Sequence, residues 1–207
     1  MGGSLKDKYF WKLQGFVALN VVIYIAVILG INLEFYTNLN FSEDSLKQLS
    51  PPFISIFITL ILSGILPSEI KSKIVFFKWK NPLPGSRIFT ELAQKDSRIN
   101  LNDIQSKYGD LPTDSAEQNQ LWYKIYKQYR SEITIQKSHH DFLFTRDLTS
   151  VSFIFLVLFP ISIFFISNSL IISITYILYL VVQFILLRQV AKNYGNRFAC
   201  NVLAEAT

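Results

Sequence analysis

Hydrophobic residues in this chain gather in long segments that carry no charge. No charged side chain occurs in 15–33, 51–68 or 148–187. A helix of about 20 apolar residues spans the hydrocarbon core of a bilayer, which is about 30 Å thick. The segment 148–187 is long enough for two such helices, and the polar pair Asn168 and Ser169 interrupts its apolar run. The pattern therefore predicts a membrane protein with four transmembrane helices.

The organisation of the whole chain follows from these segments. Transmembrane helices are expected at 15–33, 51–70, 148–167 and 170–187, with a periplasmic loop at 34–50 and a periplasmic turn at 168–169. The other residues form a cytoplasmic N-terminal tail (1–14), a cytoplasmic helical domain (71–147) and a cytoplasmic C-terminal tail (188–207). Helices satisfy their own backbone hydrogen bonds in lipid, and no β-pattern appears elsewhere, so we expect an all-α fold.

The polar segment 71–147 carries helical patterns of its own. Asp114 and Glu117 have the spacing of a capping box, and apolar residues follow at three- and four-residue steps as far as Ile133. Shorter helices are expected after Ser86 and over 101–108. The long helix that begins after Asp114 could continue nearly unbroken into the third transmembrane helix.

Basic residues predict the orientation of the chain in the membrane. Lys6, Lys8 and Lys12 precede the first apolar segment, lysines follow the second, and the loop 34–50 is acidic. Since Lys and Arg collect on the cytoplasmic side, both termini and the domain are expected in the cytoplasm. The first apolar run exceeds a signal-peptide core and is expected to remain as an anchor. Residue usage rich in Lys, Asn, Ile and Phe, without organelle-targeting features, favours a bacterial inner membrane.

Basic and aromatic residues alternate directly after the second apolar segment. Aromatic rings favour the headgroup layer, and each lysine near an anionic surface contributes about 1 kcal/mol. Contact with membrane lipids is therefore predicted for Lys71, Lys73, Lys78, Trp79 and Lys80. The alternative interpretation is a flank that only fixes the topology.

A second basic–aromatic pattern lies within the predicted long helix. Cations recur at every third residue beside tyrosines, at Lys124, Lys127 and Arg130 and at Tyr123, Tyr126 and Tyr129. Such a surface suits a phosphate-bearing ligand or a soluble cytoplasmic protein partner. Three cations are too few for direct binding of nucleic acid. The alternative is an ordinary solvated face beside a tyrosine-rich packing face.

Uncharged polar residues recur along the predicted transmembrane helices. They are Asn20 on the first, Ser55, Thr59 and Ser63 on the second, and Thr175, Tyr179 and Gln183 on the fourth. Such groups form hydrogen bonds between packed helices, and in an oligomer they could also line an aqueous path. A small channel is therefore one alternative function. Because four helices seldom satisfy so many polar groups within one copy, we expect a homo-oligomer.

Catalytic chemistry is not indicated by any motif. Adjacent helical residues point about 100° apart, so His139, His140 and Asp141 make a poor metal site. No nucleotide-binding loop or nucleophile elbow occurs, and the single cysteine, Cys200, cannot form a disulfide within one copy. We therefore expect a protein that is not an enzyme, with no cofactor and no metal. A membrane-bound enzyme that uses 139–141 is the least favoured alternative.

The segments WYKIYK (122–127) and HHDFLFTRD (139–147) look like a family signature. In size and four-span plan the chain resembles the small membrane subunits and effectors of bacterial antiviral defence systems, such as the membrane subunit of Kiwa. This resemblance covers topology along the chain and transfers no functional residue. It implies a non-enzymatic membrane component of an antiphage system, whose cytoplasmic domain docks a partner or ligand and couples it to the membrane helices.

Overall fold

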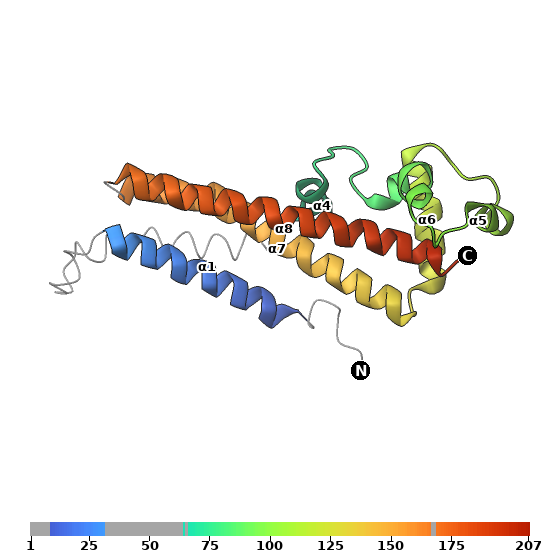
Figure 1. Ribbon diagram of the computed structural model, residues 1–207, viewed down its shortest axis with the longest axis horizontal. Helices are drawn as coiled ribbons and strands as arrows, with labels where there is room; N and C mark the ends of the chain where they lie inside the picture. Colours follow the sequence, from blue (N-terminus) through green and yellow to red (C-terminus); the bar gives the residue numbers. More distant parts are fainter. Residues whose placement is uncertain (1–8, 32–63, 65, 167–168) are drawn as a thin grey trace. The chain divides into compact units, whose positions relative to one another are not determined.

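The computed structural model describes residues 9–31, 64, 66–166 and 169–207, and those ranges contain helices and no strand. Figure 1 shows α1 (Phe10–Ile31), α4 (Ser68–Phe76), the short helices η1 (Pro84–Arg87), η2 (Ile88–Leu92) and η3 (Ala93–Lys95), α5 (Leu101–Tyr108), α6 (Ser115–Tyr129), α7 (Ile133–Ile166) and α8 (Leu170–Ala204). The all-α prediction is confirmed for the described residues.

Three of these helices are long and apolar enough to cross a membrane, namely α1, α7 and α8. They contain the predicted transmembrane segments at 15–33, 148–167 and 170–187, apart from residues outside the described ranges. Most of the segment predicted at 51–70 lies outside the described residues, and α4 begins near its end, at Ser68. Three of the four predicted spans therefore have a counterpart among the described helices.

The chain divides into two compact units. The first, here called the apolar unit, contains α1 and residues 147–187; the second, the polar unit, contains residues 68–146 and 188–207. Helix α7 has 34 residues and α8 has 35, and both contribute to each unit. The polar unit is thus larger than the domain predicted at 71–147.

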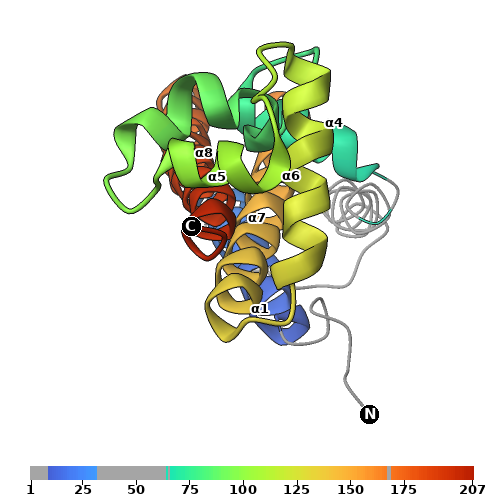
Figure 2. The same cartoon turned by 90° about the vertical axis from the view of Figure 1, so that its right-hand side faces the viewer.

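Residues 188–207, predicted as a tail, belong to the core of the polar unit. Ala191, Phe198, Ala199, Val202 and Leu203 are all buried on one side of α8. Their spacing of three, four and seven residues is that of a helix stripe facing a core. Figure 2 shows this end of α8 beside α5, α6 and the start of α7. The short stripe was overlooked because it follows directly on a much stronger apolar run.

The long helix expected from Asp114 into the third span is interrupted at 130–132, whereas its continuation through 139–147 into that span is observed in α7. Helix α6 ends at Tyr129, a turn follows at 130–132, and α7 begins at Ile133. In the turn the Glu132 N–H donates to the Tyr129 carbonyl at 3.0 Å. The change of direction buries both Ile125 and Ile135 in one core, whereas one straight helix would separate them by about 15 Å along its axis.

In the apolar unit, α1 lies alongside α7 and runs in the same direction. The Tyr9 hydroxyl donates to Asp147 Oδ2 at 2.9 Å, and the Tyr24 hydroxyl shares a hydrogen bond with Ser162 Oγ. In each pair the two residues are 138 positions apart in the sequence. A step from Tyr9 to Tyr24 is therefore matched by an equal step from Asp147 to Ser162, as in two parallel helices. The Tyr24 ring also stacks on Phe159, with the ring centroids 4.2 Å apart.

Candidate functional site

The inner side of α6 fixes this helix to the polar unit. Asp114 caps its start, and Oδ1 accepts hydrogen bonds from the N–H groups of Ala116 at 2.8 Å and Glu117 at 3.1 Å. Trp122 and Ile125 are buried, and the Trp122 indole N–H donates to the Ala199 carbonyl at 3.1 Å. Packing of Trp122 and Ile125 therefore fixes which side of α6 is turned away from the core.

The outer side of α6 presents the three predicted cations. Lys124, Lys127 and Arg130 are exposed, and none forms an ion pair with a described residue. The Lys127 ammonium lies 4.8 Å from the centroid of the Tyr123 ring, which is 48% exposed. We call Tyr123 and these three cations the basic face of α6. Every third residue advances 300° around a helix, so the three cations spread over about 120° rather than one narrow ridge.

The other two tyrosines of the pattern pack inward. The Tyr126 ring stacks on Trp122 with centroids 5.7 Å apart, and its hydroxyl shares a hydrogen bond of 3.2 Å with His139 Nδ1. Burial raises the pKa of Tyr126. Tyr129 is half-buried against the same core. The structure therefore leaves Tyr123 as the ring that the basic face offers to a ligand.

The histidine segment does not assemble a metal site. The His139 ring stacks on Phe198 with centroids 4.6 Å apart, and burial, together with the charge of Arg146, lowers its pKa to about 4. His140 Nδ1 instead lies 3.2 Å from Asp141 Oδ1. Within the described ranges no three His, Cys, Asp or Glu residues come together. His139 acts here as a neutral ring in an aromatic cluster.

The predicted lipid-contacting residues separate into two groups. Lys71 is buried, and the Lys73 ammonium lies 2.7 Å from Glu69 Oε1. Neither lysine is therefore exposed and unpaired, as the predicted contact with lipid headgroups requires. Lys78, Trp79 and Lys80 are exposed. The reason for the difference is that α4 ends at Phe76: Lys71 and Lys73 belong to a packed helix, and the other three follow it.

The described residues of the polar stripes form hydrogen bonds within the apolar unit. The Tyr179 hydroxyl donates to Gln183 Oε1 at 2.7 Å, and Gln183 Nε2 donates to Ser152 Oγ on α7 at 3.3 Å. Asn20 Nδ2 donates to the Phe16 carbonyl at 3.0 Å, and Thr175 Oγ1 to the Ile171 carbonyl at 2.9 Å. Ser55, Thr59 and Ser63 lie outside the described residues. Of these four bonds, only the one between Gln183 and Ser152 joins two helices, as the packing interpretation expects; the other three lie within one helix and do not distinguish packing from a conduction path.

Asp147 is a buried ionisable residue that the sequence reasoning missed. It lies next to the charge-free segment that begins at Leu148, it is buried, and it accepts the hydrogen bond from Tyr9. Ionisable groups at the edge of a membrane segment are costly unless they have partners. The polar run TRDLTSVS (145–152), buried throughout, was the available signal.

No protein-family model, no curated protein sequence and no solved structure matches this chain. The resemblance to antiviral membrane subunits therefore remains a prediction from size and plan.

Proposed function

We propose that this chain is a non-enzymatic membrane protein whose polar unit binds a soluble partner through the basic face of α6. The observation that carries the proposal is the combination, on one packed helix, of a half-exposed tyrosine ring and three exposed cations that form no ion pair with the residues the structure describes. Tyr and Arg are enriched in protein interfaces, and an acidic partner surface complements Lys124 and Lys127. The expected partner therefore carries a cluster of carboxylates beside an apolar contact for Tyr123.

Four crossings are part of this proposal. If α1 and α7 cross the membrane in the same direction, as their two tyrosine contacts indicate, the chain between them must return an odd number of times. The charge-free segment 51–68 is the stretch between them with the length to do so. The basic flanks then place both termini and the polar unit in the cytoplasm of a bacterial cell.

Coupling between the partner and the membrane is proposed to use α7 and α8. Each helix contributes residues to both units, which supports transmission along unbroken helical backbone. Assembly into a homo-oligomer and membership of an antiphage system complete the proposal, and the latter depends only on the resemblance in size and plan.

A photo-crosslinking amino acid at Tyr123, in the full-length protein in native membranes, tests the docking surface. We expect a crosslink to one soluble acidic protein. The double variant Lys124→Glu/Lys127→Glu should reduce it about thirtyfold, because charge pairs at an interface rim contribute on the order of 1 kcal/mol each. The matched control Lys95→Glu/Lys137→Glu makes the same change at exposed lysines of the same unit. Equal loss in both variants, or crosslinks to lipid alone, would contradict the proposal.

A further inference from the structure

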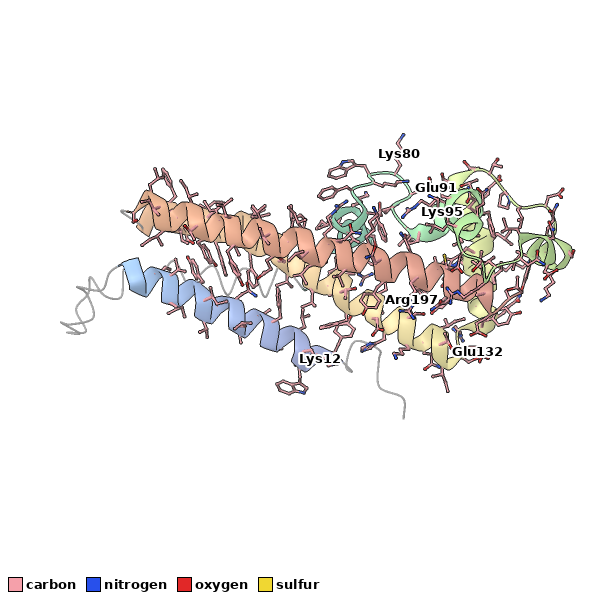
Figure 3. All side chains as sticks on the ribbon, in the orientation of Figure 1. Lys12, Lys80, Glu91, Lys95, Glu132 and Arg197 are labelled. Carbon is pink, nitrogen blue, oxygen red and sulfur yellow. The ribbon has the colours of Figure 1, made fainter. Side chains whose placement is uncertain are left out.

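The segment that follows α4 exposes two large aromatic rings beside two lysines. Phe77 is 60% exposed and Trp79 is 83% exposed, and Lys78 and Lys80 are exposed as well. Figure 3 shows Lys80 extending away from the ribbon. Large exposed apolar patches mark interaction surfaces, and two aromatic rings exposed within three residues of each other are a candidate for one.

The backbone at Phe77 adopts a conformation that is strained for a bulky residue. Phe77 has φ +50°, and its N–H donates to the Lys73 carbonyl at 2.9 Å, which ends α4 in the left-handed conformation. Glycine is the usual residue at such a helix end, and a bulky residue there is uncommon. Asn81, at φ +47°, adopts the left-handed conformation at the other end of the segment. Backbone strain that surrounding contacts maintain is typical of functional segments.

A third cation adjoins the Phe77 ring. The Arg188 guanidinium, also in the polar unit, lies 3.7 Å from the centroid of the Phe77 ring. Burial of Lys71 and the ion pair of Lys73 with Glu69 leave Lys78, Lys80 and Arg188 as the cations that accompany the rings. The surface therefore combines apolar rings with a concentrated positive charge.

We propose that Phe77, Lys78, Trp79, Lys80 and Arg188, here called the aromatic–basic patch, bind the headgroup layer of a bilayer that contains anionic lipid. Trp is enriched at the boundary between headgroups and acyl chains, and Lys and Arg beside it attract anionic phosphate groups. A lipid surface meets both requirements at once, because it offers an apolar layer directly below a negative one. This inference does not depend on the basic face of α6.

Quenching of a fluorescent label by brominated lipid tests the patch. The full-length protein carries a nitrobenzoxadiazole label at Lys80→Cys, with Lys95→Cys as the matched control in the same unit, both in a Cys200→Ser background. Each is reconstituted as a single copy in nanodiscs of brominated phosphatidylcholine, with or without phosphatidylglycerol. We expect at least twofold stronger quenching at position 80 than at 95, and stronger quenching with phosphatidylglycerol. Equal quenching at both positions would overturn the proposal.

The variant Phe77→Gly/Trp79→Ser separates lipid binding from folding. Glycine relieves the left-handed strain at position 77, so the melting temperature should be retained, while quenching at position 80 should fall to the level at position 95. Quenching that survives this variant would contradict the role of the rings. A label at position 80 that is buried only when several copies share a liposome, and not in nanodiscs with a single copy, would identify a second copy as the occupant. That result would also overturn the proposal.

Discussion

Phe198→Ala is expected to lower the free energy of unfolding of the polar unit by about 3–5 kcal/mol, the usual loss for a buried phenylalanine. The Phe198 side chain is only 5% exposed. Its ring contacts Trp122 and Tyr126 edge-on and stacks with His139 and Phe142. Removal of the ring leaves a cavity that touches α6, α7 and α8 together, and these helices cannot all close around it.

The thiol of Cys200 offers a direct measurement of this effect. Cys200 is the single cysteine of the chain, it is buried in the same core, and burial raises its pKa to about 11. Its labelling rate under native conditions reports opening of the polar unit, so a loss of about 3 kcal/mol accelerates labelling more than a hundredfold. Val190→Ala, at a position 41% exposed on the same helix, is the control and should change the rate little. Similar rates for both variants would show that 188–207 does not belong to the core.

Gly195→Ala should destabilise the polar unit by about 1–2 kcal/mol, although alanine is the better helix former by up to about 1 kcal/mol. An added Cβ would lie 2.7 Å from Phe76 Cζ and 2.9 Å from Phe142 Cε2. Both rings are buried, so neither moves aside without disturbing its neighbours. Overpacking therefore outweighs the gain in helix propensity. Thermal unfolding followed by circular dichroism measures the net result.

Gly15→Ala is the matched control for this substitution. It is also within a helix, α1, and an added Cβ there meets no atom within 4 Å. It should therefore leave stability unchanged or raise it. In the Gly195→Ala background, Phe76→Leu shortens the nearest side chain and should restore part of the lost stability. A stabilising effect of Gly195→Ala would contradict the close contact between α8 and the two rings.

Much of the fold follows from the sequence because the signals are strong and local. The charge-free segments predict α1 and the apolar parts of α7 and α8, and Asp114 predicts the start of α6. The break at 130–132 was not predictable from periodicity, since either side of it has helical spacing. It arises from tertiary packing, which buries Ile125 and Ile135 in one core.

The candidate site was predicted less completely. Exposure of Lys124 and Lys127 follows from their position opposite Trp122 and Ile125 on α6. Tyr126 follows Lys124 by two residues, which is about 200° around a helix of 3.6 residues per turn, so the two side chains lie on opposite sides. The burial of Asp147 and the partnership with Tyr9 depend on a contact across 138 residues, which a local pattern does not reveal.

We propose that α1 and α7 cross the membrane side by side in the same direction, which requires one return crossing between them. Cross-linking of cysteine pairs by a short bismaleimide, in the full-length Cys200→Ser protein in membranes, tests it most directly. Tyr24→Cys with Ser162→Cys should cross-link efficiently, because these residues are in contact. Tyr9→Cys with Ser162→Cys should not cross-link, because Tyr9 lies 15 residues before Tyr24, and 15 helical residues extend about 22 Å along the axis. Efficient cross-linking of the second pair and not of the first would mean that α1 and α7 are antiparallel, which would contradict the parallel crossing.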